Sequence, residues 1–255
     1  MEIKIGTSGY SFDDWVGSFY PPETQKGKRL DYYVRFFPAV EINSTYYRIP
    51  HPAIMANIDK KAPPGFEFIV KTPEILTHKR KNIEKLIAEF NESIRPMVDS
   101  DRLKGLLAQF PFSFKFSQGN LEYVRYCQEQ LKPHQLFVEF RHNSWVNRTV
   151  YDDFLAHAIG YVAVDEPQLP GLLRPDCFNT TETAYIRLHG RNAEHWWNGG
   201  PLRYDYDYSA DEIREWKEKV KKLEGKAKKV FIFFNNCHLG QAVKNARQMM
   251  EMLNI

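Results

Sequence analysis

Eight short runs of strand-forming residues recur along the whole chain, separated by longer segments, and this alternation restricts the fold more than any other feature. The runs are IKI at 3–5, VEIN at 40–43, FEFIV at 66–70, LKGLLAQF at 103–110, LFVEFR at 136–141, YVAV at 161–164, AYIRL at 184–188 and VFIFF at 230–234. Helix-length crossovers join parallel strands, and eight such units close into a ring. We therefore expect a single-domain (β/α)₈ TIM-like barrel over 1–255, with an open doubly wound sheet as the alternative.

Helical periodicity fills most of the intervals between these runs. It is clearest over 82–99, where apolar residues return every three or four positions, as on a helix with one buried face. Ser209 and Glu212 have the spacing of a capping box and should start a helix at 209–223. The interval 166–183 is rich in proline and glycine, so we expect little regular helix there. The other expected helices lie near 28–37, 51–60, 118–132, 147–159 and 239–253.

Charge and cysteine content argue against several classes of protein. The chain has 35 basic and 32 acidic residues, an excess too small to make nucleic acid the default partner. Cys127, Cys177 and Cys237 lie far apart, so neither a disulfide framework nor a structural zinc site is indicated. We find no apolar leader and no run approaching the ~20 apolar residues of a membrane span, and we expect a cytoplasmic protein.

Polar residues occupy the barrel-facing positions of several expected strands. Because side chains alternate across a strand, Val40 and Ile42 should face the helices while Glu41 and Asn43 face the interior. Buried charges are costly unless paired, so a ligand site explains this pattern better than packing, and a structural ion-pair network is the alternative. The inward or strand-end polar residues are Glu41, Asn43, Lys71, Gln109, Glu139, Arg141, Asp165, Arg187, His189, Asn235 and Asn236.

Ordered motifs along the chain resemble those of a known family. They are GTSGYSFDDWVGSFYP at 6–21, VEINSTYYRIP at 40–50, FIVKTPEILTH at 68–78, LLAQFP at 106–111, LFVEFRHNSW at 136–145, VDEP at 164–167, YIRLHGRN at 185–192 and FNNCHLGQAVKNA at 234–246. The chain is similar to the uncharacterised TIM-barrel proteins catalogued as domain of unknown function 72, the YecE-like proteins. This resemblance implies a TIM-like barrel with its site at the C-terminal ends of the strands, and it supplies no reaction.

The basic residues of this set favour an anionic ligand. Lys71, Arg141, Arg187, His189 and Arg191 could hold a phosphate or sugar phosphate, with arginine offering bidentate geometry. The first loop, GTSG at 6–9, could also present amides and hydroxyls to an anion, although an ordinary strand-end turn is the simpler interpretation.

Carboxylates and histidines supply candidates for proton transfer. Glu41 and Glu139 could act as general acid and base, and their separation would test a glycosidase-like pair. We expect no metal, because the histidines near strand ends lack a matching carboxylate set, and the sequence requires no cofactor. The segment 189–200 combines charge, aromatic residues and glycine, which favours a mobile lid. The histidines concerned are His78, His142, His189 and His238.

These features favour an enzyme, a hydrolase or isomerase acting on a small anionic substrate such as a sugar phosphate. A barrel that binds nucleic acid or takes part in DNA repair, and a non-catalytic metabolite-binding protein, are the alternatives. The catalytic candidates are Glu41, Glu139, His189 and Asp165. The substrate-binding candidates are Thr7, Ser8, Tyr10, Trp15, Asn43, Tyr46, Lys71, Gln109, Arg141, His142, Trp145, Arg187, Arg191, Asn235 and Asn236.

Overall fold

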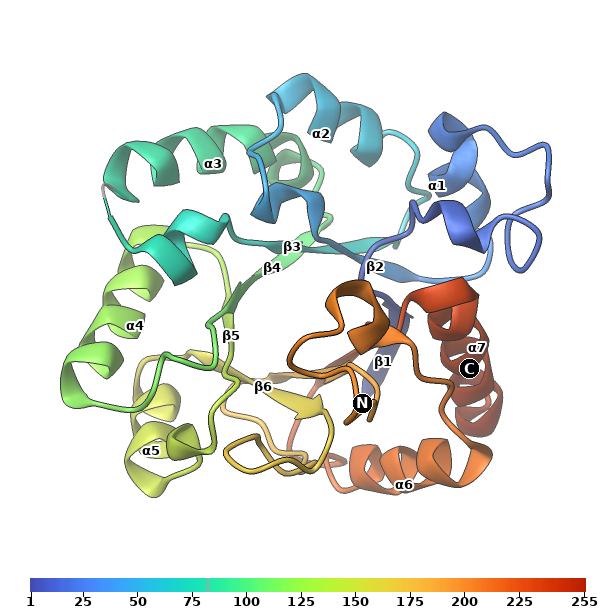
Figure 1. The fold of residues 1–255 in the computed structure, drawn as a ribbon. Coiled ribbons are helices and arrows are strands. Elements are labelled where there is room, and N and C mark those ends of the chain that lie inside the picture. Colours follow the sequence, from blue (N-terminus) through green and yellow to red (C-terminus); the bar gives the residue numbers. More distant parts are fainter. Residues whose placement is uncertain (82) are drawn as a thin grey trace.

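The computed structural model describes residues 1–81 and 83–255, and within them eight parallel strands form one ring (Figure 1). Neighbouring strands follow the order β1-β8-β7-β6-β5-β4-β3-β2. Between β1 and β2 the ring is completed by a parallel bridge of Ser8 with Glu41 and by a hydrogen bond from the Gly9 amide to the Glu41 carbonyl, 2.8 Å long. The expected (β/α)₈ barrel is confirmed in a nearly closed form. The strands are β1 (Glu2–Thr7), β2 (Ala39–Ile42), β3 (Glu67–Lys71), β4 (Leu103–Gln109), β5 (Leu136–Glu139), β6 (Gly160–Asp165), β7 (Thr183–Leu188) and β8 (Lys229–Phe234).

Helices surround this ring on its outer side (Figure 1). The α-helices of the described residues are α1 (Arg29–Tyr33), α2 (Pro52–Asp59), α3 (Ile83–Asp99), α4 (Gln118–Leu131), α5 (Arg148–Ala156), α6 (Ala210–Lys221) and α7 (Gln241–Leu253). Short 3₁₀ helices cover Asp13–Trp15, Lys26–Lys28, Ser44–Tyr46, Asn143–Trp145, Gly200–Tyr204 and His238–Gly240, and a π turn covers Ile75–Lys79. None of the helices described is both long and apolar enough to cross a membrane.

Most helix boundaries agree with the sequence pattern. Ser209 and Glu212 form the expected capping box at the start of α6. The β6–β7 crossover has no helix, as its prolines and glycines indicate. The helix expected at 28–37 is shorter than predicted, because the chain turns before Pro38 and a residue preceding proline disfavours helical geometry. Asn82, the expected first residue of the helix at 82–99, lies outside the described residues.

Aromatic side chains fill the barrel interior toward the N-terminal ends of the strands. Phe137 of β5 meets Tyr185 of β7 edge-on, with ring centroids 5.1 Å apart, and Tyr185 lies 6.3 Å from Phe231 of β8. Gly105 and Gly160 lie on the strands flanking β5, and a Cβ at either position would meet the Phe137 ring at 2.5 Å or 2.3 Å. These glycines leave the space that the phenylalanine fills, so the polar residues above rest on an aromatic floor.

Candidate active site at the barrel mouth

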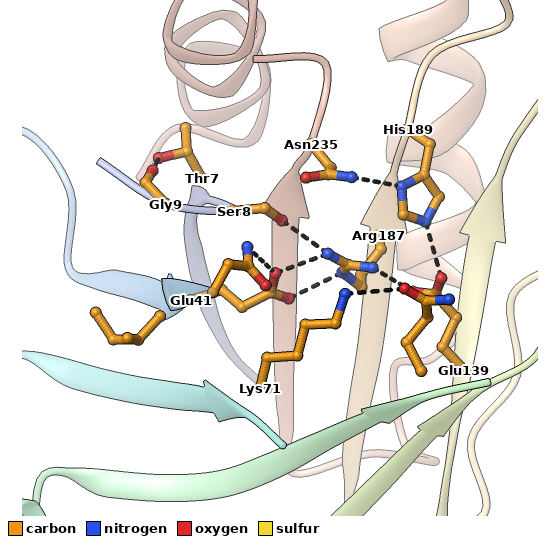
Figure 2. A network of polar contacts seen from close by, with 12 residues as sticks. Thr7, Ser8, Gly9, Glu41, Lys71, Glu139, Arg187, His189 and Asn235 are labelled. Atoms are coloured by element: carbon orange, nitrogen blue, oxygen red, sulfur yellow. Dashed lines mark hydrogen bonds and ion pairs between the residues drawn. The ribbon is translucent and has the colours of Figure 1, made fainter. Parts of the chain in front are cut away.

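A buried arginine on β7 binds two carboxylates from opposite sides (Figure 2). Arg187 is 1% exposed, and its Nε and Nη2 donate to Glu41 Oε2 and Oε1 at 2.9 Å and 2.7 Å. Its Nη1 donates to Glu139 Oε2 at 2.6 Å. Asn43 Nδ2 and the Tyr185 hydroxyl also donate to Glu41. The guanidinium therefore occupies the space between the two carboxylates, and a glycosidase-like pair with a sugar between them does not fit this geometry.

Arg141 extends this network toward β6. Its Nε lies 2.7 Å from Glu139 Oε1, and its Nη1 donates to Glu166 Oε2 at 3.2 Å. His189 Nε2 lies 3.3 Å from Glu139 Oε1, and His189 Nδ1 lies 2.8 Å from Asn235 Nδ2. Glu139 thus contacts two arginines and a histidine, and both arginines are held in fixed orientations.

Burial and neighbouring charge fix the protonation of this network. Burial opposes ionisation of Glu139, but Arg141 and Arg187 outweigh it and hold the pKa of its carboxyl well below the ordinary value. Burial and Arg141 lower the pKa of His189 to about 3, so its imidazole is neutral. Burial raises the pKa of Glu166 to about 7. Glu139 is consequently an anion that positions arginines at neutral pH, and the structure gives it no proton to donate.

Lys71 reaches into the same interior from the end of β3 (Figure 2). Its Nζ donates to Gln109 Oε1 at 2.9 Å and lies 4.4 Å from the centre of the Tyr46 ring. In the part of the chain that the structure describes, no carboxylate oxygen lies within 4.0 Å of this amine. Burial, assisted by Arg187, lowers the pKa of Lys71 to about 7. This amine can therefore gain or lose a proton near neutral pH.

A small pocket of about 140 Å³ opens above the network. The described residues that line it include no aspartate or glutamate. Their charged side chains are those of Lys71, Arg141 and Arg187. The lining residues are Ser8, Phe12, Asn43, Tyr46, Tyr47, Lys71, Gln109, Arg141, Arg187, Tyr204 and Asn235. The carboxylates thus lie beneath the cations, and the pocket presents positive charge to a ligand.

Comparison with known proteins adds a family to this geometry. A family model described as "Protein of unknown function DUF72" matches residues 4–255. The chain belongs to the DUF72 family. The UPF0759 protein YunF of Bacillus subtilis (strain 168) is 34% identical to it, over 99% of this chain and 95% of that protein.

Two solved DUF72 structures share the same fold. A DUF72 protein from Thermotoga maritima MSB8 is 42% identical, with a TM-score of 0.93 and full coverage of both chains. A DUF72 protein from Enterococcus faecalis V583 is 28% identical, with a TM-score of 0.89, over 99% of this chain and 96% of the other. The resemblance inferred from the sequence motifs is confirmed, and the reaction has to be argued from the site.

Two tryptophans predicted to bind substrate belong to the core of this DUF72 protein. Trp15 is fully buried, and its Nε1 donates to the Cys237 carbonyl at 2.6 Å. Trp145 is also fully buried and stacks on Phe140 with ring centroids 3.9 Å apart. Their expected contact with a ligand is wrong, because large side chains beside strand ends pack inward under the loops as readily as they point to solvent.

Other predicted residues also lie apart from the pocket. Thr7 Oγ1 donates to the Gly9 carbonyl at 2.6 Å, and Asn236 is buried and donates to Asn245 and to the Tyr206 carbonyl. Tyr10 lines a neighbouring pocket of about 190 Å³ that shares Ser8 with the candidate pocket, and His142 Nδ1 lies 2.9 Å from Ser144 Oγ. The first loop therefore reaches the pocket through Ser8, whose Oγ accepts from Arg187 at 3.4 Å.

The remaining histidines are scattered around the mouth. His78 lies beside Tyr46 with ring centroids 5.4 Å apart, and His238 lies between Asp14 and Asp205, at 4.0 Å and 3.8 Å from their carboxylates. Residues 1–81 and 83–255 contain no group of three or more histidine, cysteine, aspartate or glutamate side chains placed to hold a metal ion.

Asp165 and Arg191 form a separate cluster against α6. Arg191 Nε lies 3.0 Å from Asp165 Oδ2, while its Nη1 and Nη2 donate to Glu212 and Glu215 at 3.1 Å and 3.0 Å. Asp165 points toward the helices, where it contacts Arg191, and the next residue, Glu166, faces the barrel interior, where it contacts Arg141. Glu166, and not the predicted Asp165, is therefore the carboxylate that joins the network, and the uniformly apolar run at 161–164 does not show which of the two points inward.

Arg191→Met tests this structural role. We expect the free energy of unfolding to fall by about 1–3 kcal/mol, because charge-assisted hydrogen bonds are lost. The loss should stay moderate, since burial already raises the pKa of Asp165 and the carboxyl can take up a proton. Chemical denaturation measures it, with Arg214→Met, an exposed arginine paired with Asp211, as control. Weakened anion binding without destabilisation would instead place Arg191 in the site.

The segment after β7 covers one side of the mouth. Trp196 is 2% exposed, and the guanidinium carbons of Arg141 and Arg203 lie 5.5 Å and 5.4 Å from its ring centre. Tyr204 of this segment lines the pocket, and Trp197 is 46% exposed. Figure 1 shows the segment in orange over the ring of strands. A mobile lid remains a prediction. Tyr204 and Phe12 also line the pocket and were not predicted, since loop residues carry no alternation to place them.

Proposed function

We propose that this DUF72 protein is an enzyme that acts on a small anionic substrate, such as a sugar phosphate, at the mouth of its barrel. A hydrolase or an isomerase is the reaction class that we favour. The observation that supports this most directly is the pocket lining, in which Lys71, Arg141 and Arg187 are the charged side chains among the described residues. Arginine forks bind phosphate and carboxylate groups with high geometric specificity.

The arginines suit catalysis because their orientation is fixed before a ligand arrives. Glu41 and Glu139 hold Arg187 from two sides, and Glu139 and Glu166 hold Arg141. Donors held in place stabilise developing negative charge without the cost of reorganisation. Glu41 and Glu139 are then positioning residues. Proton transfer falls to Lys71, whose pKa of about 7 lies near neutral pH.

The pocket size restricts the part of the substrate that can be enclosed. At about 30 Å³ for each water molecule in the liquid, a volume of 140 Å³ holds a phosphate group and a few neighbouring atoms. The rest of the substrate would extend between Tyr47, which is 84% exposed, and Tyr204. The cationic lining suits the anionic end of a metabolite better than it suits a neutral extruded nucleobase.

Anion binding should depend on pH through Lys71. We expect sulfate to raise the melting temperature most at about pH 6 and to do so less above about pH 7, because the pKa of Lys71 is lowered and its amine becomes neutral there while Arg141 and Arg187 stay charged. Sulfate stays fully ionised over this range, so its own titration does not contribute. Thermal denaturation with sulfate and glucose 6-phosphate makes the measurement. Lys71→Met should reduce the pH dependence to the part contributed by Glu166, whose pKa is also about 7 and which pairs with Arg141. Lys79→Met, an exposed lysine paired with Glu74, should retain the wild-type pH dependence.

The same assay separates the competing functions. Stabilisation by sugar phosphates supports the enzyme proposal and defines compounds for turnover assays. A response to short DNA alone would favour the nucleic-acid alternative, which also predicts strong salt dependence. If anions have no effect at low ionic strength, the proposed function is wrong.

A further inference from the structure

Several lysines that are at least partly buried are paired with carboxylates, whereas Lys71 has no such pair among the described residues. Lys229, for example, lies 2.5 Å from Glu67 and 3.0 Å from Glu2, and Lys61 lies 2.9 Å from Asp31. Lys71 has a neutral amide oxygen and the face of an aromatic ring as partners, and it faces the pocket. An amine without a carboxylate partner gains little from remaining protonated, so its lone pair is available for chemistry.

We propose that Lys71 forms an imine with its substrate, which identifies the substrate class as a small aldehyde or ketone that carries a phosphate or carboxylate group. This inference rests on the proposed function, and it adds a covalent step and a carbonyl group to it. Arg141 and Arg187 line the same pocket as the amine and would bind the anionic group of such a compound.

The charges around the amine favour its neutral, nucleophilic form. Burial is the largest cause, and Arg187 and Arg141 act in the same direction against Glu139 and Glu41, which gives Lys71 a pKa of about 7. Tyr46 and His78 face this region as well: burial raises the pKa of Tyr46 to about 12, and burial with Lys71 lowers that of His78. An ordinary lysine, with a pKa near ~10.4, has roughly a thousandfold less free amine at neutral pH.

The step balances without an oxidant or reductant. The Lys71 nitrogen attacks the carbonyl carbon, the C=O electron pair moves to oxygen, and the nitrogen loses a proton to give a carbinolamine. The hydroxyl group then leaves with a proton as water, and a C=N bond forms. When protonated, this imine withdraws electrons from the neighbouring carbon, which assists loss of a proton or cleavage of a carbon–carbon bond there. Isomerisation is the outcome nearest to the proposed function.

Borohydride trapping tests the inference on the intact protein. The wild-type chain is incubated with dihydroxyacetone phosphate or with pyruvate, then with sodium borohydride, and its mass is measured. We expect a stable adduct with the mass of the probe, less one water and plus two hydrogens, mapped to the Lys71 peptide at roughly tenfold or more above any other lysine. The two probes distinguish phosphate from carboxylate as the anionic group.

Matched controls separate this inference from the proposed function. Lys71→Met should give no adduct, and Lys79→Met should give the wild-type amount. Glycerol 3-phosphate, which has no carbonyl, should raise the melting temperature without forming an adduct. Stabilisation by glycerol 3-phosphate with no adduct from either carbonyl probe, or with adducts spread evenly over surface lysines, overturns the imine and leaves the proposed function standing. Neither stabilisation nor adduct overturns both.

Discussion

Arg187→Met is expected to lower the free energy of unfolding by about 3–5 kcal/mol, because it leaves two buried carboxylates without their shared cation. Arg187 is 1% exposed and is held by Glu41 and Glu139, which are both fully buried. In a chain of this length such a loss corresponds to a fall of roughly 10 °C in melting temperature. Chemical denaturation and calorimetry measure the two quantities.

Arg148→Met is the matched control for this substitution. Arg148 lies 2.8 Å from Asp152, but its side chain is 87% exposed, so its ion pair should contribute little to stability. Adding Glu41→Gln and Glu139→Gln to Arg187→Met should recover part of the stability, since the unpaired charges are then removed. Equal small effects at positions 187 and 148 would show that the buried network is not what holds the barrel mouth together.

Lys71→Met is expected to increase stability while weakening anion binding, since Arg141 and Arg187 remain in the pocket. The folded-state pKa of Lys71, about 7, lies below the ordinary lysine value, so the unfolded chain binds a proton more tightly than the folded chain. The resulting destabilisation is fully present below about pH 7 and disappears as the pH rises toward the ordinary value. We expect a gain of about 1–2 kcal/mol at neutral pH, moderated by the partial exposure of the amine to solvent.

The measurement is denaturant unfolding of the wild type and of Lys71→Met at several pH values. The gain should be largest at or below neutral pH and should shrink as the solution becomes alkaline. Lys79→Met should change stability by less than about 0.5 kcal/mol at every pH. A variant that is less stable than the wild type at neutral pH would show that Lys71 supports the fold, and its role in the pocket would lose its main argument.

The residues that face the barrel interior could be predicted where polar and apolar residues alternate along a strand of sufficient length. Glu41 and Glu139 lie inside as the period-two pattern requires, and so does Arg187. The sequence also placed Lys71 in the pocket, but not its role, because the low pKa arises from the arginine and the burial that distant strands supply. Which of the inward side chains contact one another depends on their distances in three dimensions, and these distances cannot be read from their spacing along the chain.

The failures have equally local causes. Asp165 and Glu166 are adjacent, and choosing between them requires the phase of β6, which a short apolar run defines poorly. Trp145 follows β5 directly and resembles a loop residue in the sequence, yet it stacks on Phe140 in the core. The pocket walls at Tyr204 and Phe12 come from loops, whose paths depend on packing rather than on a repeat.

Phe137 and Tyr185 form an aromatic floor that fills the barrel interior toward the N-terminal ends of its strands. Gly105 and Gly160 flank the Phe137 ring so closely that side chains fill this end of the interior. A ligand would therefore reach the pocket from the opposite end, where Tyr47 and Tyr204 line it. Under the proposed function, substrate and product would therefore pass through the same opening. Any motion of the segment that carries Trp196 would consequently affect both ligand entry and ligand release.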